Sequence, residues 1–320
     1  MITNENADIS VIIPTFRRPD MLRTAIQSVL TQRNCTVEII VVDDHSCDET
    51  ASVVKEFPGV RYFENKENRG PGYSRKFGLS QCSGKYVAFL DDDDYYIDSD
   101  FFSYAIRIMA SHTDYVFLAG RGKTLDYETN QYITEAFPLS GEVPAIDYLS
   151  GISIRYRVPQ TFAIVFSKAA LISSGIPDMD MVNHVPMIMR CLQSGNVYFS
   201  ERAVGVYRQH EGNISKAMTA EFIIENLAEK HQLLPLLKER SADFDSHYWW
   251  LRQINNTISY YVYGTNPKMK GILKVKHWCI QNSENKKEIV GVFKKYEKHI
   301  IANAIYEFKI AIKRRLGVIQ

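Results

Sequence analysis

Six aspartates stand in two clusters, and each cluster directly follows a short apolar run. Asp43 and Asp44 follow Val37–Val42, and the run Asp91–Asp94 follows Tyr86–Leu90. Four adjacent carboxylates repel one another, which favours a bound cation between them. Carboxylate oxygens suit Mg²⁺ or Mn²⁺, and Mg²⁺ commonly bridges a protein carboxylate and substrate phosphates. The alternative is a cluster of turn and N-cap residues, but four aspartates directly after a buried strand fit that alternative poorly.

Apolar runs and helical periodicities alternate along the first 120 residues. This alternation is typical of βαβ units, so it predicts an α/β fold with a mostly parallel sheet flanked by helices. Ligands of such sheets bind at the carboxyl ends of the strands, which is where both acidic clusters fall. Strands are predicted at Ile9–Pro14, Val37–Val42, Val60–Phe63, Tyr86–Leu90 and Tyr115–Ala119, with helices at Asp20–Gln32, Glu49–Phe57, Gly72–Gln81 and Asp100–Ala110.

The remainder of the chain falls into a less regular middle part and a helical end. Strands are predicted at Thr161–Phe166 and Val197–Phe199, and a helix at Met187–Leu192. Beyond Ala217 the apolar pattern is helical almost throughout. We therefore expect one α/β domain over residues 1–215 and a helical C-terminal region over residues 216–320.

The order of the motifs resembles that of family 2 glycosyltransferases of the GT-A fold, which is Rossmann-like. The resembling motifs appear in the family's order and span about two-thirds of the chain. They are a first strand and nucleotide loop at Val11–Arg18, a uracil-binding segment at Val41–Ser46, a glycine-rich helix start with a phosphate-side arginine at Asn68–Leu79, a metal-binding DxD motif at Phe89–Asp94, and a closing segment at Tyr207–His210 with Asn213 and Ser215.

The resemblance implies a function and a division of the first domain. Residues 1–120 would bind the nucleotide, and residues 121–215 would bind the acceptor. The implied reaction is a metal-dependent, inverting transfer of a sugar from a nucleotide sugar, with UDP the commonest expectation, to an acceptor hydroxyl. A lipid-linked saccharide in polysaccharide or O-antigen synthesis is the implied acceptor.

The resemblance also implies roles for individual residues. Asp44, with Asp43 beside it, would accept a hydrogen bond from the base or ribose, and Arg75 would face the diphosphate. Asp93 would bind Mn²⁺ or Mg²⁺ directly, and Asp91 would hold the ribose or a metal-bound water. The full implied set is Pro14, Thr15, Phe16, Arg18, Asp43, Asp44, Arg75, Asp91 and Asp92 for the nucleotide sugar, and Asp93, Asp91 and His210 for the metal.

The general base is where this sequence departs from the family, many members of which carry an acidic Glu-Asp pair before an Arg-Leu helix end. The register set by Met189–Leu192 places Asn183 and His184 at that pair. His184 can serve as the base, because the reference pKa of histidine is near neutrality. Asp178 and Asp180 are the alternative bases if the loop aligns differently with the acidic pair of the family.

Two other functions compete with the transferase. A chain without a working base would be a nucleotide-sugar-binding protein that does not catalyse transfer. A nucleotidyltransferase also uses acidic residues and a metal, but the absence of a basic glycine-rich loop after the first strand argues against it.

Cysteine usage and charge bear on location and partners. The five cysteines include no CxxC pair, which predicts a reducing compartment. No leader-like start and no run of about 18 apolar residues occur, so the sequence predicts a cytoplasmic protein. Residues 266–320 carry 13 Lys and Arg against 4 Asp and Glu, a net of +9 that leaves −8 for the rest. The basic helix Asn285–Leu316 suits docking on the inner face of the cell membrane, with a solvated basic face as the alternative; no nucleic-acid partner is expected.

Overall fold

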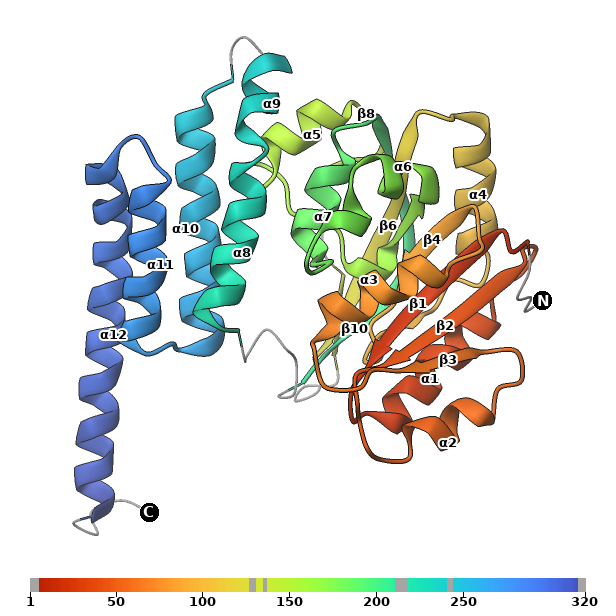
Figure 1. Cartoon of the computed structure of the whole chain (residues 1–320), viewed down its shortest axis with the longest axis horizontal. Helices are drawn as coiled ribbons and strands as arrows, with labels where there is room; N and C mark the ends of the chain where they lie inside the picture. The colour runs from red at the N-terminus through yellow and green to blue at the C-terminus, as the bar shows by residue number, and fades with distance from the viewer. Residues whose placement is uncertain (1–5, 127–130, 135–136, 211–217, 241–243, 316–320) are drawn as a thin grey trace. The chain divides into compact units, whose positions relative to one another are not determined.

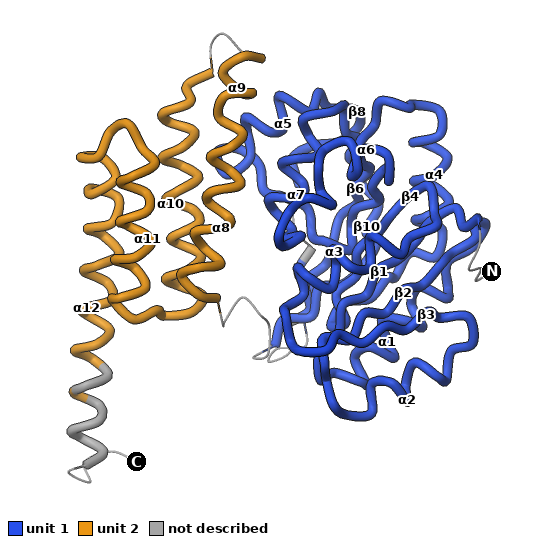
Figure 2. The backbone as a smooth tube through the Cα atoms, viewed as in Figure 1, with its two compact units in different colours: residues 1–210 blue, residues 211–320 orange. Residues whose placement is uncertain are grey.

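The computed structural model describes residues 6–126, 131–134, 137–210, 218–240 and 244–315. The chain forms two compact units, residues 1–210 and residues 211–320, and each is described by itself (Figure 2). Asn213, Ser215 and Leu316 lie outside the described residues, as do the side chains of Lys313 to Arg315.

The first unit is built on a mixed sheet of ten strands in the described residues, and its first half is parallel (Figure 1). The central strand β1 (Ile9–Thr15) pairs in parallel with β2 (Val37–Asp43) and β4 (Tyr86–Phe89), and β2 pairs in parallel with β3 (Arg61–Glu64). The helices of this half are α1 (Pro19–Leu30), α2 (Thr50–Lys55), α3 (Pro71–Gln81) and α4 (Phe101–Ser111).

The second half of the sheet contains antiparallel pairs. Strand β9 (Ile164–Ser167) runs antiparallel between β4 and β6 (Tyr115–Asp126), and β10 (Asn196–Gln209) runs parallel to β6. The remaining elements of this unit are β5 (Tyr95–Tyr96), β7 (Gln131–Thr134), β8 (Gly141–Val143), α5 (Ala145–Gly151), α6 (Lys168–Ser173), α7 (His184–Cys191) and the 3₁₀ turns Thr161–Ala163 and Ile176–Asp178.

Apolar strands and one close helix contact fix the carboxyl edge of the parallel half. All seven residues of β1 and of β2 are buried, as the largely apolar sequence of each strand predicts. Helix α3 lies close to β1 because Gly78 has no side chain; a Cβ there would lie 2.5 Å from Ile12 Cγ2. Both acidic clusters therefore end at the same edge of the sheet, since β2 and β4 flank β1 in parallel.

Two middle elements differ from the sequence predictions. The predicted strand Thr161–Phe166 begins as a 3₁₀ turn and becomes strand only at Ile164. The predicted strand Val197–Phe199 is the start of the fourteen-residue β10. The polar residues Ser200–Arg202 hide this length in the sequence, and the register shifts between Phe199 and Gly205 accommodate them. The longer strand carries Arg208 to the acidic turn after β4.

The second unit is helical, as the sequence predicts. Its helices are α8 (Ala220–His231), α9 (Leu234–Arg240), α10 (Ser246–Thr265), α11 (Met269–Gln281) and α12 (Lys286–Arg315). Trp249, Ile258 and Tyr296 are buried in its core. None of the helices in the described residues is both long enough and apolar enough to cross a membrane.

A buried glutamate ties together the amino-terminal ends of the strands. Glu38 of β2 is fully buried and accepts hydrogen bonds from the Ser10 hydroxyl, the Arg61 guanidinium and the Ser83 backbone N–H. Burial alone would raise the pKa of Glu38, but these donors outweigh it and hold the pKa below its ordinary value. The carboxylate thus stabilises the fold only while it is ionised.

We predict that Glu38→Gln lowers the free energy of unfolding by about 2 to 3 kcal/mol, because donors that face a carboxylate are left with a neutral amide. Urea titration at pH 7 measures the loss. Glu56→Gln is the matched control, because Glu56 forms an exposed pair with Arg23 and should change stability little. The depressed pKa means that the contribution of Glu38 is present above the unfolded value of about 4.3 and is lost as pH falls through the folded value. An unchanged urea midpoint for Glu38→Gln would contradict this role.

Candidate active site

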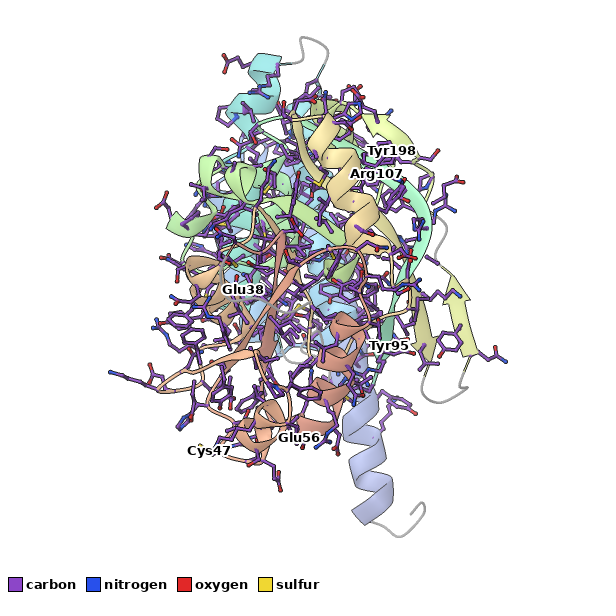
Figure 3. All side chains as sticks on the ribbon, turned by 90° about the vertical axis from the view of Figure 1, so that its right-hand side faces the viewer. Glu38, Cys47, Glu56, Tyr95, Arg107 and Tyr198 are labelled. Atoms are coloured by element: carbon purple, nitrogen blue, oxygen red, sulfur yellow. The ribbon has the colours of Figure 1, made fainter. Side chains whose placement is uncertain are left out.

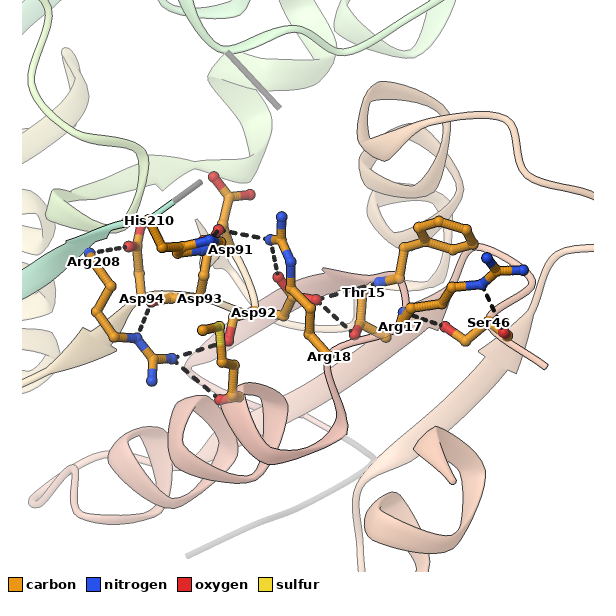
Figure 4. A network of polar contacts seen from close by, with 12 residues as sticks. Thr15, Arg17, Arg18, Ser46, Asp91, Asp92, Asp93, Asp94, Arg208 and His210 are labelled. Carbon is orange, nitrogen blue, oxygen red and sulfur yellow. Dashed lines mark hydrogen bonds and ion pairs between the residues drawn. The ribbon is translucent and has the colours of Figure 1, made fainter. Parts of the chain in front are cut away.

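The four aspartates after β4 form a tight turn that is largely buried. Asp94 donates its N–H to the Asp91 carbonyl at 3.0 Å, and Asp92, Asp93 and Asp94 are each 5% exposed or less. Arg18, from the loop between β1 and α1, lies between two of them (Figure 4). Its Nη1 is 3.0 Å from Asp92 Oδ1 and 2.6 Å from Asp93 Oδ2. A guanidinium of the chain itself therefore compensates charge where the sequence led us to expect a bound cation.

A second arginine holds the backbone of the acidic turn from the other side. Arg208 of β10 is buried, and its guanidinium donates to the carbonyls of Asp92 and Asp93 and, at 3.3 Å, to that of Met21 (Figure 4). Its backbone N–H donates to Asp94 Oδ1 at 3.2 Å. Arg208 thus fixes the turn to β10 and α1. Nothing in the sequence predicts this role except the position of Arg208 in the closing motif.

The loop after β1 is anchored to the same turn. Thr15 Oγ1 and the Phe16 N–H both donate to Asp92 Oδ2, at 2.8 and 3.2 Å. Pro14 is buried in β1, paired with Val42. Phe16 is 36% exposed, which leaves an aromatic ring at the carboxyl edge of the sheet where a nucleotide base can pack. The structure thus brings Thr15, Phe16 and Arg18 together with Asp92.

The carboxylates of Asp43 and Asp44 each accept three hydrogen bonds from the chain itself. Asp43 accepts hydrogen bonds from Ser46 and from the Tyr62 hydroxyl. Asp44 accepts from the Asn65 side chain and from the N–H groups of Arg69 and Gly70. Both are buried, with exposed fractions of 2% and 3%. These hydrogen bonds order the loops beside the edge of the sheet, and the contact of Asp44 with a base or ribose stays a prediction.

A third cluster joins α3, the acidic turn and α7. The Arg75 guanidinium pairs with Asp91, whose side chain is 30% exposed. His184, the first residue of α7, is close enough for both Arg75 and Asp91 to act on its protonation. Two buried nitrogens of this cluster, Arg75 Nε and His184 Nε2, have no hydrogen-bond partner. Unpaired buried polar atoms cost free energy, so a cluster with two of them is suited to a polar ligand.

Close packing determines where His184 lies. The Val182 N–H donates to the Gly72 carbonyl at 3.1 Å, and a Cβ on Gly72 would lie 2.9 Å from Asn183 Oδ1. The Pro159 carbonyl interacts with the imidazole, and because Nε2 has no partner this contact falls to Nδ1. A proton on Nδ1 leaves the Nε2 lone pair free to accept a proton.

Burial shifts the pKa values of the site towards the neutral forms. Burial raises the pKa of Asp92 to about 6, although Arg18 opposes the shift. Burial and the neighbouring charge of Asp91 raise the pKa of Asp93, and Arg18 and His210 oppose that shift. Burial, helped by the Arg75 charge, lowers the pKa of His184 to about 4. His184 is therefore neutral at pH 7, as a general base must be.

The predicted metal ligands only partly converge. His210 Nε2 lies 3.1 Å from Asp93 Oδ2, whereas Asp91 pairs with Arg75. Within the described residues no group of three or more His, Cys, Asp or Glu side chains is arranged to hold an ion. A carboxylate oxygen beside an imidazole nitrogen is nevertheless a donor pair that fits Mn²⁺, with further ligands supplied by phosphate or water.

The alternative bases differ from His184 in burial. Asp178 and Asp180 are exposed, and in the described part of the chain neither makes any of the hydrogen bonds or ion pairs of the acidic turn. His184, by contrast, is beside Arg75 and Asp91, and the choice among the three candidate bases stays a prediction.

Comparison with known proteins gives a consistent result. The model of the family "Glycosyl transferase family 2" matches residues 10–173, just over half of the chain. A GalNAc(5)-diNAcBac-PP-undecaprenol β-1,3-glucosyltransferase of Campylobacter jejuni is 46% identical over 91 residues, 27% of this chain and 29% of that protein. An Escherichia coli UDP-Glc:α-D-GlcNAc-diphosphoundecaprenol β-1,3-glucosyltransferase is 26% identical over 221 residues, 67% of this chain and 82% of that protein.

Several of the curated matches are short relative to the proteins they match, and the structural match concerns the fold. Four curated relatives, the Campylobacter protein among them, are matched over only 19% to 29% of their own length. The crystal structure of S. aureus TarS 1-349 in complex with UDP-GlcNAc superposes with a TM-score of 0.65 at 17% identity, over 97% of this chain and 92% of that chain. This likeness shows that the fold is shared.

We predict that Arg208→Ala lowers the free energy of unfolding by about 3 kcal/mol, because it removes a buried cation that satisfies three carbonyls beside four carboxyl groups. Thermal and urea unfolding measure the effect. Arg202→Ala is the control, since Arg202 is a half-exposed residue of the same strand paired with Asp98, and its loss should matter much less. Equal losses for the two variants would show that Arg208 is not the anchor of the turn.

Proposed function

Since the chain belongs to glycosyl transferase family 2, we propose that it transfers a sugar from a UDP-sugar onto a hydroxyl of a lipid-linked saccharide, with inversion at the anomeric carbon. The main support for this proposal is the cluster of Arg75, Asp91 and His184, which lies beside the buried acidic turn. Two buried nitrogens of this cluster have no hydrogen-bond partner and are suited to a polar ligand. The names of the Campylobacter and E. coli relatives support an undecaprenol-linked acceptor, and UDP-glucose is the first donor to test.

The donor's parts match the chemistry of the edge of the sheet. The exposed ring of Phe16 suits packing against a uracil base, and the planar guanidinium of Arg75 suits the diphosphate. Arg18 adds a second guanidinium beside the acidic turn. The diphosphate would bind where these cations meet.

Asp93 and His210 would hold a divalent cation, which would stabilise the charge of the departing nucleoside diphosphate as a Lewis acid. Arg18 Nη1 now contacts the same carboxylate oxygen at 2.6 Å. Arg18 must therefore leave Asp93 when a cation binds, and its guanidinium then becomes available to the diphosphate.

His184 would act as the general base. The acceptor hydroxyl gives its proton to Nε2 while its oxygen forms the bond to the anomeric carbon, and the bond from that carbon to the diphosphate breaks. A single displacement of this kind inverts the configuration. Only one base is needed, so the neutral imidazole can replace the acidic pair that many members carry.

We also propose that the helical unit contacts an anionic membrane surface, where a lipid-linked acceptor resides. Exposed apolar and basic side chains support this, among them Ile301, Ile305, Tyr306, Lys268 and Lys270. Such a mixture favours the interface of an anionic bilayer.

We predict that UDP binding is strengthened by Mn²⁺ and that Asp93→Asn weakens the Mn²⁺-dependent part at least about tenfold, because a carboxylate ligand is lost. Calorimetric titration of UDP with and without Mn²⁺ measures both effects. Asp100→Asn is the control, since Asp100 pairs with Arg33 on the surface and should leave both affinities unchanged. Mn²⁺-independent UDP binding by the unmodified chain would contradict the metal role.

We predict that His184→Ala lowers kcat by about 10² to 10⁴ while the affinity for UDP-sugar changes less than about threefold, because the base acts on the acceptor. His184→Asp supplies a carboxylate and should retain more activity. With a pKa of about 4, protonation of His184 itself should reduce kcat/KM only near pH 4, well below the ordinary histidine value. A loss of activity at higher pH would instead report the raised pKa values of Asp92 and Asp93. UDP release from UDP-sugar and a lipid-linked acceptor measures turnover, with His112→Ala as an exposed control.

Full activity of His184→Ala would mean that another residue is the base. Donor binding without turnover by the unmodified chain would favour a nucleotide-sugar-binding protein that does not catalyse transfer.

A further inference from the structure

A cysteine, a histidine and a glutamate meet at the surface beside the candidate nucleotide loop. Cys47 is exposed, and its Sγ lies 3.4 Å from His45 Nε2. On the other side of the imidazole, His45 Nδ1 lies 3.4 Å from Glu64 Oε1. Figure 3 shows Cys47 at the periphery of the molecule. His45 belongs to the segment Val41–Ser46 that resembles a uracil-binding motif, but none of the three side chains is assigned a step in the proposed transfer reaction.

The backbone holds this cluster in place. His45 and Cys47 both have a left-handed backbone, with φ values of 66° and 55°. Ser46 between them is buried and donates twice, through its N–H and its hydroxyl, to Asp43 Oδ1. Glu64 ends β3 directly opposite Asp43 in the parallel pair of β2 and β3. The three side chains are therefore brought together by the sheet register and by a loop fixed at its centre.

The arrangement places a thiol nucleophile next to a base, with a carboxylate 3.4 Å from the other ring nitrogen of that base. His45 Nδ1 is shielded from solvent and has no hydrogen-bond partner, and the Glu64 carboxylate is the charge it faces. A proton on Nδ1 beside that carboxylate leaves Nε2 to accept the proton of the Cys47 thiol.

The other four cysteines contrast with Cys47. Burial raises the pKa of Cys35 to about 11 and that of Cys82, Cys191 and Cys279 to about 12. A thiol reacts as its thiolate, so these four are poor nucleophiles. We propose that Cys47 is an activated thiol that exchanges with small-molecule disulfides, of which oxidised glutathione is the representative.

The exchange balances without any further reactant. The Cys47 thiol passes its proton to His45 Nε2, and the thiolate sulfur attacks one sulfur of the disulfide. The disulfide bond of the reagent breaks as the new bond to Cys47 forms, and the released thiolate takes the proton from the imidazolium. The product is a mixed disulfide at Cys47 and one free thiol.

A mixed disulfide at Cys47, here called a cap, would disturb the loop between β1 and α1 that carries Phe16 and Arg17. This consequence rests on the proposed function. Ser46, the preceding residue, accepts the Arg17 N–H on its hydroxyl at 2.8 Å and Arg17 Nε on its carbonyl at 3.2 Å. Arg17 follows Phe16, the ring that would pack against the base. A glutathione moiety on the neighbouring residue would therefore strain the contact that orders this loop and weaken UDP binding.

The reactivity is tested with oxidised glutathione on the full chain at pH 7, with modified peptides followed by mass spectrometry. We expect Cys47 to react first and roughly tenfold faster than an unactivated exposed thiol. His45→Asn should slow it to the unactivated rate, since asparagine tolerates the left-handed backbone but is no base. Cys35→Ser is the control and should leave the rate unchanged. An equal rate at Cys47 with and without His45 would overturn the proposal.

The consequence is tested by titrating UDP into protein capped at Cys47. We expect at least about fivefold weaker binding, restored by dithiothreitol, and no effect of glutathione disulfide on the UDP affinity of Cys47→Ser. Unchanged affinity of the capped protein would overturn the effect on donor binding and leave the thiol reactivity standing. Failure of uncapped protein to bind UDP would count against the proposed function alone, because the exchange rate does not depend on it.

Discussion

The structure depends on how the charges of four consecutive aspartates are compensated in a buried turn. An unpaired carboxylate in such a place costs several kcal/mol. The compensation comes from three arginines far apart in the sequence: Arg18 before α1, Arg75 in α3 and Arg208 in β10. The turn can keep its shape only if the helices and strands that carry these arginines are all in position. The site is therefore a product of the complete first unit rather than of one motif.

The ion pairs that compensate the aspartate charges also define the ligand-free state from which the proposed reaction would begin. A buried acidic turn without arginines would bind a cation tightly, but the turn would be unstable when no cation is bound. With Arg18 between Asp92 and Asp93, a cation must displace a guanidinium, which lowers its affinity and stabilises the turn in its absence. A nucleoside diphosphate offers the displaced guanidinium a new anionic partner. In the proposed reaction, metal and donor would favour each other's binding, since each would stabilise the rearrangement that the other needs.

Local patterns were enough to predict the parallel strands and the convergence of the acidic clusters, because parallel strands flanking β1 must end at one edge. They were not enough to predict which residues form hydrogen bonds with Asp44 and with the acidic turn. Asp44 is anchored to Asn65 and Gly70, and Arg208 reaches the turn only because β10 continues past a polar interruption. Both facts depend on contacts distant in sequence. The prediction that His184 is the base came from the register of a family motif, since composition alone gives a histidine no such role, and it stays a prediction.

The imidazole at position 184 is consistent with the charges around it. A carboxylate there would compete with Asp91 for Arg75, and the pair that connects α3 to the acidic turn would weaken. A neutral imidazole leaves that pair intact, and Arg75 in turn keeps the imidazole unprotonated by lowering its pKa. In the proposed reaction this lower basicity would reduce the driving force for proton transfer from the acceptor. Stabilisation of the departing diphosphate by Arg18, Arg75 and a bound cation would offset this loss, since a better leaving group needs less help from the base.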